Sequence, residues 1–185
     1  MTKPPVDIKN IPILISAQDL AARVNGLARE IAATIPRDML IVSLLRGSFV
    51  FTSDLIRALH NSGAQPQVDF LTLSSYGSGT TSKGVVNIVR DLADPVEGHD
   101  VLIVDDILES GRTLTFARNL MMERKAKSVK IAVLLEKPGK RKVDVTADFV
   151  GFKIEDEFVI GYGLDYANFF RELPYIGYIP STTAS

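Results

Sequence analysis

The chain has 185 residues, 46% of them hydrophobic and 23% charged, and its formal net charge is −1. This size and balance predict one globular domain and speak against a nucleic-acid partner, because nucleic-acid-binding domains are usually basic. The absence of cysteine excludes disulfides and thiolate sites, and two isolated histidines argue against a histidine metal cluster. With neither a signal-peptide pattern nor an apolar run of ~20 residues, we expect a cytoplasmic protein with no membrane partner.

The hydrophobic pattern alternates between helices and strands along the chain. Ser16 is a typical N-cap for a first helix, which carries Leu20, Val24, Leu27 and Ile31 on one stripe. Two further helices are predicted, over Phe49–His60 and Thr113–Arg124. The predicted strands are Met39–Leu45, Val68–Ser74, Val85–Val89, Val101–Asp105, Val129–Glu136, Phe149–Ile154, Phe158–Ile160 and Tyr175–Ile179.

This order predicts an α/β fold, with a largely parallel twisted sheet flanked by helices. Residues 1–185 are expected to form a single domain. Its core would span about residues 36–148, and segments of about 1–15 and 149–180 would form a small hood lobe. The polar, glycine-containing stretch Tyr76–Gly84 predicts a loop, which is either a lid over a site or a plain hairpin connection.

The segment Val101–Leu114, VLIVDDILESGRTL, carries the strongest functional signal. A buried parallel strand delivers Asp105 and Asp106 to its carboxyl end, where carboxylates accept from sugar hydroxyls or bind a metal. A small, hydroxylated turn then opens a helix, which is where backbone N–H groups and the helix dipole hold a phosphate. Together these groups suit a phosphorylated sugar.

Four separate segments resemble one family, the type I phosphoribosyltransferases, and within it the hypoxanthine-guanine branch. VLIVDDILESGRTL resembles the signature that binds phosphoribosyl pyrophosphate, and Leu44–Ser48 resembles the pyrophosphate loop. Leu73–Gly77 is similar to the start of the flexible lid, and Phe149–Arg171 to the purine-binding hood. The resemblance implies transfer of a 5-phosphoribosyl group to N9 of hypoxanthine or guanine, with release of pyrophosphate, in a homodimer or homotetramer.

The resemblance also implies which residues bind the sugar donor. Asp105 and Asp106 would lie beneath the ribose hydroxyls beside Mg²⁺, the expected cofactor, and Asp165 would bind a second Mg²⁺. Leu45, Arg46 and Gly47 would bind pyrophosphate through a loop that has a cis peptide before its basic residue. The other donor-binding residues are implied to be Ser110, Gly111, Arg112 and Thr113 for the 5′-phosphate, Ser75 and Tyr76 in the lid, and Arg171 near pyrophosphate.

Another group of residues would bind the purine. Lys137 matches the lysine that donates to the purine 6-oxo group, a contact that adenine's amino group cannot accept. Phe158 would stack on the ring, Val159 would bond its edge through the backbone, and Ile107 would pack against the other face. Taken alone, Lys137 is an ordinary strand-end lysine, and Phe158 could equally be a core residue.

Glu109 departs from the family pattern, which has aspartate at this position as the proton acceptor near purine N7. Glutamate keeps the carboxylate but adds a methylene, and misplacement of about 1 Å can cost ~100-fold in rate. We expect the function to be retained. The alternative is a regulator that keeps the fold as a nucleotide sensor with weak or no catalysis. Near-neutral charge and the joint presence of Lys137, Asp165 and Arg171 argue against that alternative.

Overall fold

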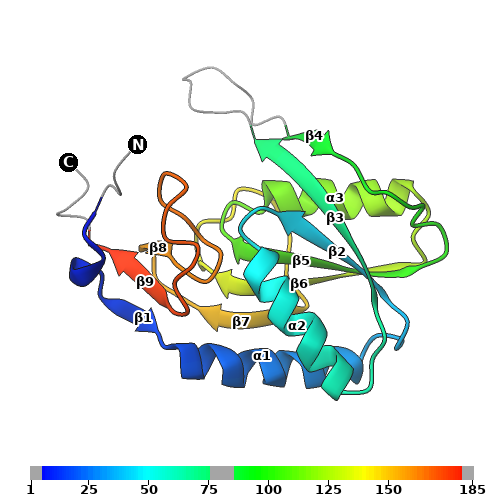
Figure 1. Ribbon diagram of the computed structural model, residues 1–185. Helices are drawn as coiled ribbons and strands as arrows, with labels where there is room; N and C mark the ends of the chain where they lie inside the picture. The colour runs from blue at the N-terminus through cyan, green and yellow to red at the C-terminus, as the bar shows by residue number, and fades with distance from the viewer. Residues whose placement is uncertain (1–5, 76–85, 181–185) are drawn as a thin grey trace.

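The molecule is built around one twisted sheet. The structure is a computed structural model that describes residues 6–75 and 86–180, with Ser75 described by its backbone alone. Within these residues, six strands form the sheet in the order β4-β3-β2-β5-β6-β7 (Figure 1). All neighbours are parallel except β3 and β4. The strands are β2 (Leu40–Leu45), β3 (Gln67–Ser75), β4 (Val86–Arg90), β5 (Asp100–Leu108), β6 (Ser128–Glu136) and β7 (Phe149–Lys153).

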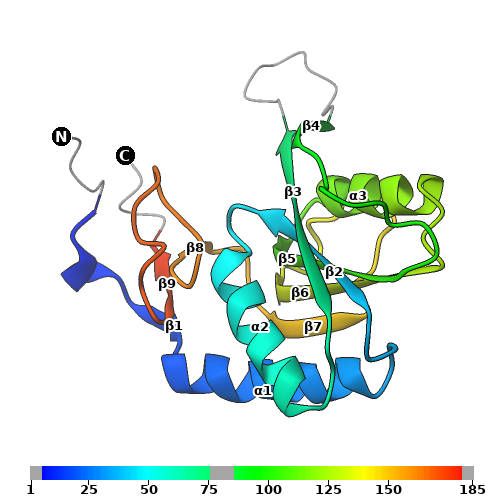
Figure 2. The same cartoon turned by 45° about the vertical axis from the view of Figure 1, so that its right-hand side comes forward.

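Helices cover both faces of this sheet. α1 (Ala17–Ala32) and α2 (Phe49–Asn61) lie on one face and α3 (Arg112–Glu123) lies on the other (Figures 1 and 2). Successive residues of β5 serve the two layers, because Leu102 belongs to the core beneath α1 and α2 whereas Ile103 belongs to the core beneath α3. Burial on both faces explains why the central strands read as continuous apolar runs.

A small hood sits at one end of the sheet. It is a three-stranded antiparallel sheet of β1 (Ile13–Ile15), β9 (Ile176–Ile179) and β8 (Phe158–Ile160), preceded by the 3₁₀ turn Ile8–Asn10. Segments from both ends of the chain therefore lie side by side (Figure 1). The hood has its own small core of buried residues, namely Ile11, Ile160, Phe170, Leu173 and Ile179.

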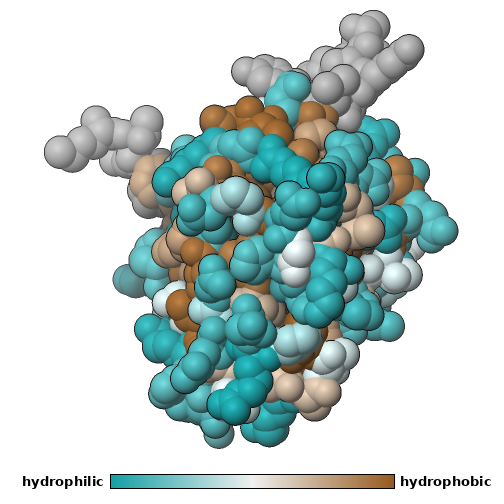
Figure 3. Space-filling model, turned by 90° about the vertical axis from the view of Figure 1, so that its right-hand side faces the viewer, coloured by the Kyte–Doolittle hydropathy of each residue, from teal (hydrophilic) through white to brown (hydrophobic). Residues whose placement is uncertain are grey.

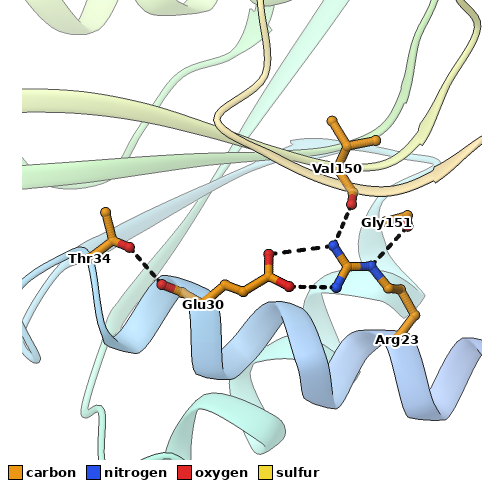
Figure 4. Close-up of polar contacts among 5 residues, drawn as sticks. All are labelled: Arg23, Glu30, Thr34, Val150 and Gly151. Carbon is orange, nitrogen blue, oxygen red and sulfur yellow. Dashed lines mark hydrogen bonds and ion pairs between the residues drawn. The ribbon is translucent and has the colours of Figure 1, made fainter.

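One arginine ties the first helix to the exposed edge of the main sheet. The Arg23 guanidinium donates to the carbonyl oxygens of Val150 and Gly151 on β7, at 2.7 and 2.9 Å (Figure 4). Its other terminal nitrogen pairs with Glu30 at 2.6 Å, about two turns further along the same face of α1. Edge strands carry unpaired carbonyls, so Arg23 satisfies groups that no further strand covers.

The strand order places a crevice in the middle of the sheet. From β2 the chain passes to β3 on one side, and from β5 it passes to β6 on the other. The β2–β5 ladder ends at the Ser43–Val104 pair, whereas the β5–β6 ladder continues to the Leu108–Glu136 pair. Ligands of open α/β sheets bind at such a point, outside the carboxyl ends of the strands.

The predicted fold is confirmed, and the predicted helices and strands are present with small shifts at their ends, but there are three larger differences. The strand β1 (Ile13–Ile15) was not predicted. β5 runs on to Leu108, three residues beyond its expected end, because β6 continues to pair with it. β7 pairs with β6 in the main sheet, so the expected core boundary at residue 148 is too early and Phe149–Lys153 belongs to the core. The expected loop Tyr76–Gly84 lies outside the described residues.

The surface is mostly hydrophilic on the face shown in Figure 3, with hydrophobic residues gathered near the top. On β4, which lies at the top of the molecule in Figure 1, Ile88 is 37% and Val89 66% exposed.

In residues 6–75 and 86–180, no helix is both long and apolar enough to span a bilayer.

Candidate active site

Two adjoining cavities of about 270 and 580 Å³ open at the carboxyl ends of β2, β3 and β5. The smaller one lies over the turn before α3, and the larger one extends from β5 to the hood. Seven residues line both cavities, which therefore form one continuous site: Leu45, Arg46, Gly47, Leu73, Asp106, Ile107 and Glu109.

The acid pair lies at the floor of this site. Asp105 is buried, and one of its carboxylate oxygens accepts the backbone N–H of Asp106 at 3.0 Å. Burial, together with the charge of Asp106, raises the pKa of Asp105 well above its ordinary value. Burial also raises the pKa of Asp106, opposed by its hydrogen bond with Asp105 and by the positive charge of Arg171. Two adjacent carboxylates in low dielectric would favour the approach of a cation or of hydroxyl donors.

The turn after β2 packs directly against these acids. The Leu45–Arg46 peptide is cis, as the family resemblance implied. A Cβ on Gly47 would lie 1.5 Å from Asp106 Oδ2, so only glycine lets the turn pass this close to the carboxylate. A buried hydroxyl network fixes the turn from below, since Ser43 Oγ lies 2.8 Å from both Ser48 Oγ and Thr52 Oγ1.

The turn before α3 has the geometry of a phosphate-binding helix start. Gly111 is the N-cap residue with φ of 80°, and the Gly111 carbonyl accepts from Thr115 N at 2.9 Å. A Cβ on Gly111 would come within 2.5 Å of Val145, so the turn is packed closely on the segment after β6. Lys142 N donates to the Ser110 carbonyl at 3.0 Å and joins the same two segments. The Arg112 N–H donates to Ser110 Oγ at 3.4 Å, and the turn is held at the start of the helix, where backbone N–H groups can meet an anion.

The opposite side of the larger cavity carries a cation and an aromatic ring. Lys137 directly follows β6 and is buried, with its Nζ 3.9 Å from Glu109 Oε1 and 3.6 Å from Asp156 Oδ1. Phe158 is 52% exposed and contacts Tyr166 edge to face at 5.3 Å, and Val159 beside it is buried. Phe158 is therefore open to the cavity, and its interpretation as a core residue is wrong.

The hood closes the site through one arginine and one glycine. Arg171 pairs with Asp165 at 2.6 Å and donates to the Gly163 carbonyl at 2.6 Å. Gly163 has φ of 102°, and a Cβ there would lie 2.2 Å from the Gly47 carbonyl oxygen. The hood backbone thus rests on the turn after β2.

Comparison with known proteins identifies this arrangement. Residues 14–167 match the phosphoribosyl transferase domain. The hypoxanthine phosphoribosyltransferase of Escherichia coli is 46% identical over 170 residues, which are 90% of this chain and 94% of that protein. The chain belongs to the hypoxanthine phosphoribosyltransferase family of phosphoribosyltransferase enzymes.

Two further relatives extend the family comparison. A crystal structure of a hypoxanthine-guanine phosphoribosyltransferase from Bacillus anthracis has a TM-score of 0.85 and 40% identity, covering 91% of this chain and 98% of that one. The bifunctional protein TilS/HprT of Listeria innocua is 48% identical over 89% of this chain, which spans only 25% of that protein. These relatives do not favour the nucleotide-sensing regulator.

The structure brings together most residues that the family resemblance selected. The lining residues of the two cavities include Leu45, Arg46, Gly47, Asp105, Asp106, Ile107, Glu109, Ser110, Gly111, Thr113, Lys137, Phe158, Val159, Asp165 and Arg171. Arg112 is exposed and lines neither cavity, so the structure gives no support for a binding role of its side chain. Tyr76 and the Ser75 side chain lie outside the described part.

Several lining residues were not selected from the sequence. Thr72 lines the larger cavity because β3 ends at the same sheet edge as β2 and β5, next to Leu73 and Ser74 of the segment that resembles the start of the lid. Val89 reaches it from β4, and Leu164 from the hood. The predicted end of β3 could have pointed to these residues, because the carboxyl ends of parallel strands lie at one sheet edge. The position of Val89 could not be predicted in this way, because it depends on the pairing of β3 with β4.

Proposed function

We propose that this chain transfers a 5-phosphoribosyl group from phosphoribosyl pyrophosphate to N9 of hypoxanthine or guanine, giving the nucleoside monophosphate and pyrophosphate. The observation that carries the proposal is the continuity of the site. Asp106, Ile107 and Glu109 line both the cavity over the phosphate-type turn and the cavity with Lys137 and Phe158. A donor and a purine would therefore meet above β5.

The transferred group carries positive charge on the ribose at the transition state, and negative charge grows on the leaving pyrophosphate. Asp105 and Asp106 would stabilise the ribose, while Arg46, Arg171 and the backbone near Gly47 would stabilise pyrophosphate. The backbone N–H groups of residues 110–113 would hold the 5′-phosphate. Placement of both partners in one cavity would supply much of the rate enhancement.

Purine recognition would depend on the other cavity wall. Lys137 would donate to the 6-oxo group, Phe158 would stack on one ring face and Ile107 would pack on the other. Glu109 would accept the N7 proton. Its carboxylate lines the junction of the two cavities, which supports that role despite the added methylene.

We also propose Mg²⁺ as the cofactor. Carboxylate oxygens are suitable donors, and the adjacent buried acids Asp105 and Asp106 would gain from a cation. Among the described residues, no three acidic or histidine side chains form a ready-made metal site. Mg²⁺ would therefore be held by Asp105 and Asp106, and a second ion by Asp165, with substrate oxygens completing each shell. When bound, Mg²⁺ would neutralise charge on the pyrophosphate.

The test is a turnover assay with Mg²⁺, phosphoribosyl pyrophosphate and hypoxanthine, guanine, xanthine or adenine in parallel. We expect nucleotide from a 6-oxopurine and none from adenine, and no turnover with any 6-oxopurine would refute the proposal. Glu109→Asp should preserve or raise kcat, whereas Glu109→Gln should lower it by about 100-fold. Equal rates in all three proteins would remove the proton-acceptor role from Glu109.

The cellular setting is a further part of the proposal. We propose a cytoplasmic homodimer or homotetramer that takes small-molecule substrates and binds neither nucleic acid nor membrane. A solved relative from Trypanosoma cruzi is described in terms of how its C-terminal region affects oligomeric state. Light scattering of the purified chain would give the order of the oligomer.

A further inference from the structure

Lys137 lies between two carboxylates that come from different parts of the chain. Its Nζ is 3.6 Å from Asp156 Oδ1 and 3.9 Å from Glu109 Oε1. Its side chain is only 9% exposed, while those of Asp156 and Glu109 are about half exposed, at 52% and 49%. The backbone N–H of Lys137 donates to the Leu108 carbonyl at 3.0 Å, which fixes the start of the side chain. The ammonium position therefore depends on which carboxylate holds it.

Asp156 is itself held by a second cation. It forms an ion pair with Lys140. The hydrogen bond from Lys140 is the largest cause that lowers the pKa of Asp156, and the positive charges of Lys140 and Lys137 lower it further. Asp156 thus remains ionised at neutral pH. Lys140, Asp156, Lys137 and Glu109 form a row of alternating charges, and we call these four residues the charge row.

The charge row connects the end of β6 to the segment that leads into the hood. Lys137 and Lys140 belong to the turn after β6, whereas Asp156 lies two residues before Phe158 in β8. The other nearby buried acid, Glu136, is engaged with Arg141 and lies 4.0 Å from Lys153, so it does not replace Asp156. Asp156 therefore links the cation of the purine wall to its aromatic ring.

We propose that Asp156 is a positioning residue for purine recognition, which holds the Lys137 ammonium away from Glu109. Without the Asp156 charge, Glu109 is the remaining carboxylate beside that ammonium in the charge row. A closed Lys137–Glu109 pair would occupy both the donor for the 6-oxo group and the acceptor for N7. The inference rests on the proposed function, because it takes Lys137 as the purine donor.

Glutamate at position 109 makes this restraint necessary. Its carboxylate already lies 3.9 Å from Lys137 Nζ, and an aspartate on the same backbone would be about one methylene further back. The longer side chain therefore brings the two groups within ion-pair distance, and Asp156 counterbalances that attraction from the other side.

The first experiment compares Asp156→Asn with Glu155→Gln. Both remove one negative charge from the same exposed loop, and Glu155 has no ion pair with Lys137. We expect Asp156→Asn to raise the KM for hypoxanthine about tenfold, because the buried Lys137 ammonium loses its ion pair with Asp156. The kcat and the KM for phosphoribosyl pyrophosphate should stay within about twofold of the parent values. Asp156→Glu should restore much of the purine KM, and Glu155→Gln should behave as the parent protein.

A second experiment measures binding of inosine monophosphate by calorimetry, without turnover. Asp156→Asn should weaken the Kd about tenfold, and adding Glu109→Gln to it should restore the Kd to within about threefold, because the competing carboxylate is neutralised. An unchanged Kd and purine KM in Asp156→Asn, or an equal rise of both substrates' KM values with a lower Tm, would overturn the positioning role. A parent protein that neither turns over 6-oxopurines nor binds inosine monophosphate would instead overturn the proposed function.

Discussion

The half of the site over the sheet edge is built from two turns that directly follow strands, whereas the half beneath the hood is built from residues that lie far apart in the sequence. In the first half, here the phosphate half (residues 45–47 and 105–113), two turns follow buried strands and pack within van der Waals contact of their neighbours. In the second, here the purine half, the lining side chains come from the residue after β6, from β8 and from the segment after β8. They are Lys137, Phe158, Val159, Asp165 and Arg171.

This difference matches the two tasks that we propose for the site. Phosphates are bound well by backbone N–H groups, whose positions are fixed once strands and helices form. A purine has distinct edges, and discrimination between them requires individual donors and acceptors. The two halves meet where Gly163 lies on Gly47, so the hood has a fixed position only if that contact is kept.

The largest expected effect comes from breaking that contact. Gly163→Ala places a Cβ 2.2 Å from the Gly47 carbonyl, and the residue also has φ of 102°. Because the obstacle is backbone, the hood must shift, and we expect kcat/KM for hypoxanthine to fall by about 100-fold. Steady-state kinetics with both substrates would measure the change.

Gly98→Ala is the matched control for Gly163→Ala. Gly98 has φ of 78°, but nothing lies within 4 Å of a Cβ there. It should lower stability by about 1 kcal/mol through backbone strain and leave kcat/KM unchanged. Equal losses of activity in both variants, or full activity in Gly163→Ala, would show that the contact between the halves is unimportant.

A smaller effect is expected on folding stability, because the phosphate half holds the two adjacent carboxylates of Asp105 and Asp106. Asp105 has a folded-state pKa above its ordinary value of 3.8, from burial and the Asp106 charge, so the folded state binds its proton more tightly than the unfolded state. The resulting stabilisation is complete below about pH 3.8 and is lost as pH rises through the raised pKa. In chelator, Tm should therefore fall between mildly acidic and alkaline pH.

Asp106→Asn tests this cost directly. Removing one of two adjacent buried charges should raise Tm at pH 8 by about 3 °C in chelator and flatten its dependence on pH, while lowering activity. Calorimetric scans between pH 5 and pH 8 would measure both. A lower Tm for Asp106→Asn at pH 8 would contradict the assigned repulsion.

The same comparison explains what the sequence could reveal. The phosphate half comes from contiguous motifs after apolar strands, and the family resemblance selected most of its residues, including the cis peptide before Arg46. β5 was expected to end at Asp105, because period and composition do not show that β6 goes on pairing to Leu108.

Contacts between segments that are distant in the sequence were the hardest features to predict. Asp156 was not selected, because its role depends on Lys137 and Lys140 lying opposite it across a loop. The placement of Phe149–Lys153 in the main sheet also depends on long-range pairing, since a short apolar strand fits either sheet. Arg23 gives no local signal of its contacts with β7, 127 and 128 residues away.

The smallest expected effect on activity comes from that arginine. Arg23→Met removes two hydrogen bonds to the carbonyls of Val150 and Gly151 and the ion pair with Glu30, while keeping the aliphatic stem. We expect the free energy of unfolding to fall by about 2 kcal/mol, because two half-buried carbonyls lose a charged donor. Urea unfolding would measure it, with Arg29→Met, an exposed arginine on the same helix, as the control.

Activity should separate this edge of the sheet from the site. β7 lies at the far end of the strand order from β2 and β3, and none of its residues lines either cavity. Arg23→Met should therefore keep kcat/KM within about twofold of the parent at temperatures where it is folded. A selective rise in the KM for hypoxanthine would mean that the purine half depends on β7 through the loop that carries Asp156, because that loop connects the edge strand to the hood.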